Sequence, residues 1–325
     1  MSKLTDVQVV GTEAWLIPIR TRVPLKFGRE TLSAVNLLRV RVRVRTRDGR
    51  EALGWGETPL SVQWGWPSTL SYQERLEAMV ALASRLTRAW PAFEERGHPV
   101  EIGWDFVEHR LGGILGEENA RRGGEAMPWL AALITASAYD LAIHDAYGQV
   151  LGQPVYATYT GEFLNRDLAA FLEAEAGYGE VFRGKFPADF LVVRRDRLRA
   201  WHLVGGVDPV APSESQGVAP EDGYPVLLDD WIRRDGLSCL KIKLRGNDAE
   251  WDYRRLVTVG FLACAAGVDW LSADFNCTVT EPAYVNQILD QLRDEHPRIY
   301  GMLLYVEQPF PYELETTRME VRSVS

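Results

Sequence analysis

Leu240-Lys241-Ile242-Lys243-Leu244 is a short apolar run interrupted by two lysines. Side chains alternate across a β-strand, so Lys241 and Lys243 share one face and the three aliphatic side chains share the other. Lysines on an edge strand usually keep that edge soluble, whereas a central parallel strand is covered on both faces. The segments around this run therefore decide whether it is an edge strand with solubilising lysines or a central strand with functional ones.

Two further apolar runs end in polar residues, at residues 272–276 (SADFN) and 305–309 (YVEQP). We expect both to be strand ends, with Asp274 and Asn276 on one face and Glu307 at the start of a loop. Each alone is compatible with helix capping or turn chemistry. Three such ends in succession instead favour a functional rim, because barrel enzymes place catalytic groups at the carboxyl ends of their strands.

The segments between these runs have helical periodicity, which gives an alternation of strands and helices. We expect strands at 200–207, 238–244, 270–275 and 302–306, and helices at 226–235, 248–266 and 281–296. Apolar strands separated by helices predict a parallel sheet, hence an α/β barrel or a doubly wound fold. No GxGxxG motif follows any of these strands, which weighs against a dinucleotide-binding fold.

The first half of the chain has a different order, strands first and helices afterwards, which predicts an α+β domain. Residues 6–60 have strand character, and valines alternate with arginines from Arg39 to Arg45 before the turn Asp48-Gly49. The arginine row is either an anion-binding stripe or the solvated face of a half-buried strand, and we favour the second. We expect helices at 71–90 and 128–147, with residues 112–124 as a Gly- and Arg-rich connection.

Composition limits the classes of function. The 325 residues carry a formal charge of −9, which disfavours nucleic acid or an anionic membrane as a partner. The three cysteines form no CxxC pair, and the first residues lack the apolar core of a signal peptide. There is neither an HExxH nor a GxSxG motif. We therefore expect a cytoplasmic protein without a disulfide framework.

The three strand ends together resemble the enolase superfamily, specifically its mandelate racemase/muconate lactonizing enzyme branch. The motifs are KIK at 241–243, DFN at 274–276 and VEQP at 306–309, and the first half adds GWGE at 54–57 and AYDLAIHD at 138–145. The resemblance implies an α/β plus α+β architecture. Residues 1–160 would form a capping domain, and residues 161–325 the first half of a (β/α)8, TIM-like barrel with insertions at 161–199 and 208–225.

This resemblance implies a Mg²⁺-dependent enzyme that removes a proton α to a carboxylate and forms a metal-stabilised enolate. Asp274 and Glu307 would bind the metal, and Asn276 would support the site. Lys243 would be the base and Lys241 its electrostatic partner. The reference pKa of lysine is about 10.4, and a neighbouring cation lowers it. Enolase-type sites use a lysine or histidine base together with Mg²⁺.

The resemblance also implies the partners of the protein. The substrate would be a small-molecule carboxylate, and the protein would be a homo-oligomer. Substrate loops would include Phe27, Trp64 and Trp66, although tryptophans there could equally pack between domains. The reaction stays open among racemase or epimerase, cycloisomerase and dehydratase. The alternative is a non-catalytic binding or interaction protein that keeps the scaffold with an incomplete site.

The barrel of this family has eight strands, and this chain reaches only the fourth strand-end motif. A third metal carboxylate would be expected on a fifth strand. We therefore expect the chain to represent part of a longer protein.

Overall fold

A computed structural model describes residues 2–27, 30–215 and 220–311. It divides into two compact units, and each is considered by itself below. Unit 1 comprises residues 1–19 and 34–194, and unit 2 comprises residues 20–33 and 195–325. Residues 161–194 thus have their contacts mainly within unit 1. The domain boundary expected at residue 160 stays a prediction.

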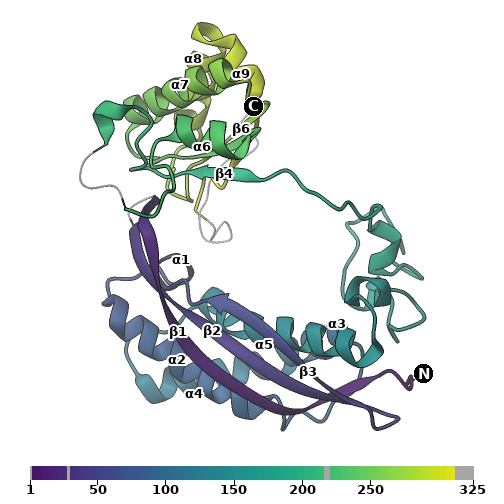
Figure 1. Cartoon of the computed structure of the whole chain (residues 1–325). Coiled ribbons are helices and arrows are strands. Elements are labelled where there is room, and N and C mark those ends of the chain that lie inside the picture. The colour runs from purple at the N-terminus through teal and green to yellow at the C-terminus, as the bar shows by residue number, and fades with distance from the viewer. Residues whose placement is uncertain (1, 28–29, 216–219, 312–325) are drawn as a thin grey trace. The chain divides into compact units, whose positions relative to one another are not determined.

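Unit 1 is built on a sheet of three strands in the order β1-β2-β3 (Figure 1). The strands are β1 (Val7–Phe27), β2 (Glu30–Thr46) and β3 (Glu51–Pro59). Residues 20–27 of β1 and 30–33 of β2 belong to unit 2. β2 and β3 are antiparallel, with Val44 opposite Ala52, and the turn between them has Gly49 at φ +89°. Its positive φ is a conformation that glycine adopts without steric cost.

The alternating valines and arginines of β2 lie as the sequence predicts. The side chains of Val40, Val42 and Val44 are fully buried. The arginines are on the other face, where Arg41 pairs with Glu13 at 2.5 Å and Arg45 with Glu51 at 2.6 Å. The interpretation of the arginine row as a solvated face is confirmed.

Helices cover one side of this sheet (Figure 1). They are α1 (Val62–Gly65), α2 (Tyr72–Ala89), α3 (Pro99–Phe106), a π-helical turn at Val107–Leu111, α4 (Gly112–Arg122) and α5 (Trp129–Leu151). Short 3₁₀ turns follow at Val155–Thr158, Leu168–Ala170 and Pro187–Phe190. α2 begins with a capping box, in which Ser71 and Glu74 each bind the backbone of the other.

The expectation of a connection at residues 112–124 was wrong, because most of this segment is α4. Its glycines have open space around them, so they meet no steric conflict in a helix. Buried Glu118 anchors the helix by ion pairs with Arg85 at 2.7 Å and Arg121 at 2.6 Å. The helix ends at Gly123, whose φ is +69°.

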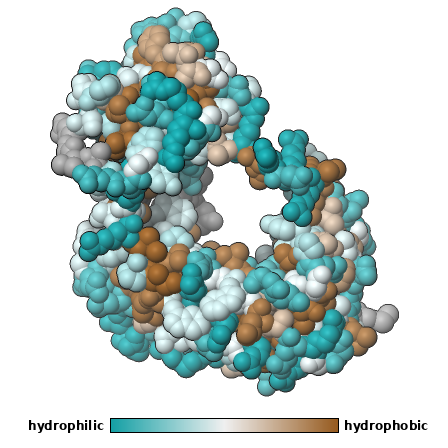
Figure 2. Space-filling view, in the orientation of Figure 1, coloured by the Kyte–Doolittle hydropathy of each residue, from teal (hydrophilic) through white to brown (hydrophobic). Residues whose placement is uncertain are grey.

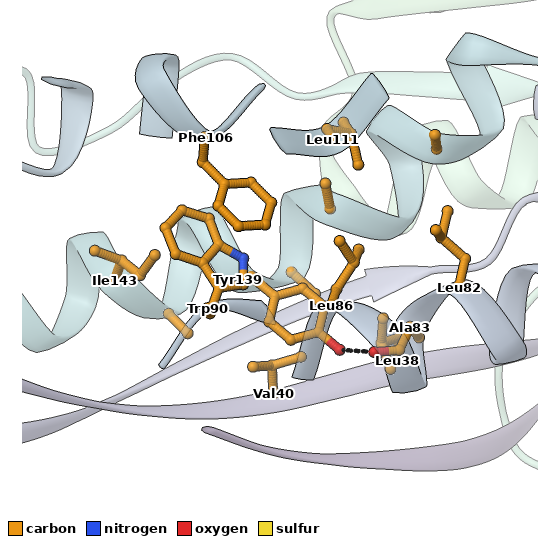
Figure 3. Close-up of a cluster of buried hydrophobic side chains, with 14 of the residues drawn as sticks. Leu38, Val40, Leu82, Ala83, Leu86, Trp90, Phe106, Leu111, Tyr139 and Ile143 are labelled. Atoms are coloured by element: carbon orange, nitrogen blue, oxygen red, sulfur yellow. Dashed lines mark hydrogen bonds between the residues drawn. The ribbon is translucent and has the colours of Figure 1, made fainter. Parts of the chain in front are cut away.

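The core of unit 1 lies between the sheet and its helices, as Figure 3 shows. Trp90 and Phe106 stack with their ring centroids 3.9 Å apart. The hydroxyl of buried Tyr139 donates a hydrogen bond to the carbonyl of Ala83 at 2.6 Å, which joins α5 to α2. A buried tyrosine needs such a partner, because an unpaired hydroxyl in the core is costly.

Helix α5 lies unusually close to strand β3. A Cβ atom added to Gly54 would lie 2.1 Å from the backbone nitrogen of Ala146, and one added to Gly56 would lie 2.1 Å from the carbonyl oxygen of Ala138. Glycines on the strand and small residues on the helix therefore let the two backbones approach each other. This packing explains why positions 54 and 56 of the sequence GWGE are glycines.

Unit 2 contains a four-stranded parallel sheet in the order β4-β5-β6-β7. The strands are β4 (Trp201–Val204), β5 (Cys239–Lys243), β6 (Trp270–Asp274) and β7 (Leu303–Glu307). The connections contain α6 (Leu228–Asp235), α7 (Ala249–Ala266), α8 (Pro282–Glu295), α9 (Pro297–Met302) and a 3₁₀ turn at Pro212–Glu214. The predicted parallel α/β order is confirmed, and α9 was not expected.

Exposed apolar residues lie among the hydrophilic residues on the surface of both units (Figure 2). Trp15 and Trp55 are examples in unit 1, and Phe261 and Leu304 in unit 2. Within the described residues, no helix is both long enough and apolar enough to cross a bilayer.

His98 is a buried residue that caps α3. Its Nδ1 accepts a hydrogen bond from the backbone N–H of Val100 at 3.2 Å, and its Nε2 lies 2.9 Å from the hydroxyl of Thr158. That hydroxyl donates to the carbonyl of Val155, so the neutral ring with a proton on Nε2 satisfies both contacts. Burial, followed by the charges of His144 and Lys3, lowers the pKa of His98 to about 3.

We expect Gly56→Ala to lower the free energy of unfolding by about 3 kcal/mol, because the new methyl group overlaps the backbone of α5. Urea denaturation measures the change. The matched control is Gly116→Ala in α4, where a Cβ atom meets open space. The control should be neutral or stabilising by up to about 1 kcal/mol. Equal effects of the two substitutions would contradict the close packing of α5 on β3.

We expect the free energy of unfolding to fall between pH 6.5 and pH 3 by about 1 kcal/mol per pH unit through His98 alone. In this window the unfolded chain binds a proton at His98 and the folded chain does not, so acid favours unfolding. His98→Asn keeps a capping side chain and should remove this part of the slope. Exposed His109→Asn should leave the slope unchanged. Identical slopes for wild type and His98→Asn in pH-dependent denaturation would contradict the account.

Candidate functional site

Five polar side chains from β5, β6, β7 and the loop after β6 meet at the carboxyl ends of these strands. The register places Lys243 opposite Asp274, and Asp274 opposite Glu307. Adjacent parallel strands in register present such residues on the same face. Lys241 and Asn276 complete the group, so all five residues predicted from the three strand-end motifs lie together.

Asp274 is the centre of this group, and its side chain is 1% exposed. Its Oδ2 accepts from Lys243 Nζ at 2.5 Å and from Lys241 Nζ at 3.0 Å. Glu307 Oε1 lies 2.5 Å from Lys241 Nζ. Two ammonium groups therefore balance two carboxylates, which is what burial of these charges requires.

Asn276 holds the cluster in place from the loop after β6. Its backbone N–H donates to Asp274 Oδ1 at 2.8 Å. Its side-chain NH₂ donates to the carbonyls of Leu244 and Asp274, both at 3.1 Å, which directs its Oδ1 to Lys243 Nζ at 2.8 Å. The predicted supporting role of Asn276 therefore has a geometric basis in hydrogen bonding.

The backbone after β6 and β7 adopts an uncommon conformation. Asn276 has φ +54° and Gln308 has φ +42°, both in the left-handed region. Non-glycine residues with positive φ carry strain, and such strain is often found at functional sites. The two loops also bind each other, because the N–H of Val279 donates to the carbonyl of Pro309 at 2.9 Å.

The protonation of Lys241 is set by the two carboxylates that lie beside it. Burial lowers the pKa of Lys241, but its hydrogen bonds and charge interactions with Glu307 and Asp274 outweigh burial and raise it. Lys241 is therefore held as an ammonium ion. The sequence shows the neighbouring lysine but not the two carboxylates, which the pairing of β5, β6 and β7 brings to Lys241.

The donor set has the chemistry that Mg²⁺ requires, because Asp274 and Glu307 offer hard carboxylate oxygens from neighbouring strands. Mg²⁺ in proteins keeps several waters and is commonly held by one or two carboxylates plus substrate oxygens. Within the part of the chain that the structure describes, no three His, Cys, Asp or Glu side chains are grouped to hold a metal. Among these described residues, Asp274 and Glu307 are thus the two carboxylates that would contribute to a metal site.

Sequence reasoning missed the other side chains on this face of the sheet. The register puts Leu203 beside Lys241 and Tyr305 beside Ser272, so these residues line the same face. Ser272 is fully buried, and its hydroxyl has no hydrogen-bond partner. An unpaired buried hydroxyl is uncommon and suits a place where water or a ligand can enter. Alternation along the strands could have placed Ser272 with Asp274 and Tyr305 with Glu307. The position of Leu203 beside Lys241 required the register between strands, which the sequence does not show.

The predicted substrate-loop residues have three different positions. Trp64 is 44% exposed in α1, and Trp66 is buried, with its Nε1 donating to Glu125 at 2.9 Å. Phe27 is the last residue of β1, and its side chain lies outside the described structure. Trp66 is therefore part of the core of unit 1.

No family model matches this chain, and no curated protein matches it in sequence. Solved structures do match it. A dipeptide epimerase from Methylococcus capsulatus, complexed with Mg and the dipeptide L-Arg-D-Lys, has 21% identity and a TM-score of 0.52 over 94% of this chain and 62% of that one. An N-succinyl Arg/Lys racemase from Bacillus cereus has 15% identity and a TM-score of 0.56 over 98% and 64%.

A mandelate racemase/muconate lactonizing protein from Herpetosiphon aurantiacus is also similar, with 16% identity and a TM-score of 0.50 over 95% of this chain and 63% of that one. This chain spans less than two thirds of the length of each of these three proteins. At identities this low, the structural similarity establishes a shared fold and nothing more specific. The resemblance inferred from the sequence motifs is confirmed at that level.

Proposed function

We propose that this chain, whose fold is the one found in the mandelate racemase/muconate lactonizing branch of the enolase superfamily, belongs to a Mg²⁺-dependent enzyme. The enzyme would remove a proton α to the carboxylate of a small molecule. The observation that carries the proposal is the convergence of Lys241, Lys243, Asp274 and Glu307 at the carboxyl ends of three parallel strands. Enzymes with parallel barrels place their catalytic groups at this rim.

The proposal extends to the architecture. The four parallel strands of unit 2 would be the first half of a (β/α)8 barrel, and unit 1 would be the capping domain of the family. Trp64 and Phe27 would belong to substrate loops, whereas the burial of Trp66 favours a packing role for it.

Lys243 is proposed as the base. Its Nζ lies on the face of the sheet shared by the two carboxylates, and its side chain is 14% exposed, so substrate could reach it. Lys241, bound to both carboxylates, would supply positive charge beside it. Asn276 would orient Lys243 through its 2.8 Å hydrogen bond. A positioned lysine of this kind acts as a general base once it has released its own proton.

Asp274 and Glu307 are proposed to hold Mg²⁺. A bound Mg²⁺ supplies positive charge that stabilises the negative charge developing on the substrate carboxylate. Mg²⁺ held there would be the positive charge beside Asp274 and Glu307, and Lys243 would be the base. In its absence the two lysines neutralise the carboxylates instead.

The reaction class within this chemistry is a racemisation or epimerisation, a cycloisomerisation or a dehydration. The similar proteins named above include an epimerase and a racemase, which supports a reaction that begins with α-proton removal. A non-catalytic scaffold is less well supported, because five polar side chains of the strand-end motifs are held in one group of hydrogen bonds and ion pairs, namely Lys241, Lys243, Asp274, Asn276 and Glu307.

The test is exchange of substrate α-protons with solvent by the full-length protein in D₂O with Mg²⁺, followed by loss of the α-proton NMR signal. The panel contains mandelate, dipeptides and N-acyl amino acids. We expect exchange on at least one compound and a loss of at least about 100-fold with Lys243→Ala, the range associated with one general base. Lys243→Ala should still bind Mg²⁺.

Lys185→Ala, at an exposed lysine of unit 1, is the matched control and should exchange at the wild-type rate. Absence of exchange on every compound of the panel would contradict the proposed reaction. Exchange retained by Lys243→Ala would show instead that another group is the base.

A further inference from the structure

Unit 2 contains a large pocket away from the cluster of lysines and carboxylates. Its volume is about 1060 Å³, and every residue that lines it belongs to unit 2. The walls are residues 22–25 of β1, strand β4 with the loop after it, and helices α6 and α7. Pockets of 300–1,000 Å³ commonly accept small organic molecules.

The pocket opens on the opposite face of the sheet from Lys241 and Lys243. In the register of β4 with β5, His202 pairs with Leu240 and Val204 with Ile242. Paired residues share a face, so His202 and Val204 lie on the face that carries the buried aliphatic residues and the helices. Both residues line the pocket, and so does Leu203 between them, which is on the face of Lys241. No residue of the lysine and carboxylate cluster lines the pocket, so it is distinct from the site of the proposed function.

Arg255 of α7 is the unusual charge in the pocket wall. It is 8% exposed, and its Nη2 donates to the carbonyls of Gly205 at 2.7 Å and Asp208 at 2.8 Å. Its Nε is buried without a hydrogen-bond partner. A buried donor without an acceptor is unfavourable, because it has lost its hydrogen bonds to water, and more so when the group is charged.

The carboxylates of Glu214 and Asp208 both attract the charge of Arg255, but neither accepts a hydrogen bond from it. Its Nη1 lies 3.8 Å from the carboxylate of Glu214, beyond hydrogen-bond distance. The other two arginines of the wall have closer partners, Arg22 with Asp222 at 2.5 Å and Arg254 with Glu250 at 3.1 Å. Arg255 is therefore the positive charge in the pocket wall that is most available to bind an anion.

The rest of the pocket wall is mainly apolar, so it can pack against an aromatic or aliphatic part of a ligand. Trp231 of α6 lies beside His202, with ring centroids 5.5 Å apart, and Trp251 of α7 lies 5.8 Å from the guanidinium of Arg255. Both tryptophans line the pocket, together with the aliphatic residues Val23, Leu25, Val204, Val207, Val226 and Leu228. Burial lowers the pKa of His202, so this ring adds no positive charge near neutral pH.

We propose that this pocket binds a small organic anion with an aromatic body, held by a charge-assisted hydrogen bond from Arg255 and by contact with Trp231 and Trp251. Such a bond is stronger than a neutral one and would supply the acceptor that Arg255 Nε lacks. The ligand would be separated from the catalytic cluster by the sheet itself. It is therefore a second ligand of the protein and not the substrate of the proposed reaction.

The test is calorimetric titration of the full-length protein with 2-naphthoate and with its neutral analogue 2-naphthalenemethanol, in EDTA without Mg²⁺. We expect the anion to bind at least 10-fold more tightly than the alcohol. Arg255→Gln should remove most of this difference. Thr258→Trp, at an exposed pocket position on α7, should fill the pocket and weaken binding by at least 10-fold.

Two controls separate this site from the rest of the protein. Arg293→Gln removes an exposed arginine of α8, and Lys243→Ala alters the opposite face of the sheet; both should bind 2-naphthoate like wild type. The proposal is overturned if the alcohol binds as tightly as the anion, or if Thr258→Trp binds like wild type. Because Thr258→Trp leaves the contacts of Arg255 intact, it decides the matter even if Arg255→Gln does not fold. Loss of binding in Lys243→Ala would assign the anion to the catalytic cluster and overturn the second site.

Discussion

The candidate site depends on the two ion pairs that Lys241 and Lys243 make with the same carboxylate, that of Asp274. A fully buried carboxylate is tolerated only with opposite charges and hydrogen bonds around it. Lys241 and Lys243 supply the charges, and the backbone of Asn276 supplies a hydrogen bond. This balance requires that β5 and β6 pair in one register only, because a shift of one residue would turn the lysines to the helical face.

The same register separates the two faces of the parallel sheet. On one face the lysines, Asp274 and Glu307 meet, and on the other the aliphatic residues pack against helices. The pocket beside Arg255 is on the helical face, so the sheet isolates two polar environments from each other. Unit 1 uses a different constraint, in which glycines of β3 admit the backbone of α5 and so fix the position of the longest helix against the sheet.

Much of the local structure could be predicted from the sequence. Period-2 alternation located β2, helical periodicity located α2, and the apolar runs located β5, β6 and β7. The segment that became α4 was missed because its glycines suggested a connection, whereas the burial of Leu115 and Glu118 stabilises a helix there. Helix propensity is a weak guide when such tertiary contacts decide.

The candidate site could be predicted only as a set of residues. Five of its members follow from strand-end motifs, but their hydrogen bonds do not, because the sequence contains no information on which oxygen each lysine meets. The face of His202 was likewise undecidable until its pairing with Leu240 was known. The environment of Arg255 depends on contacts from a loop far away in the sequence, at Gly205 and Asp208.

The central claim is that Asp274 and Glu307 together form a divalent-cation site. The most direct measurement is anomalous diffraction from crystals of the full-length protein grown with Mn²⁺, an ion that prefers the same oxygen ligands as Mg²⁺. The account predicts an anomalous peak within coordination distance of both carboxylates. A Mn²⁺ ion bound elsewhere, with Asp274 still paired to both lysines, would contradict it.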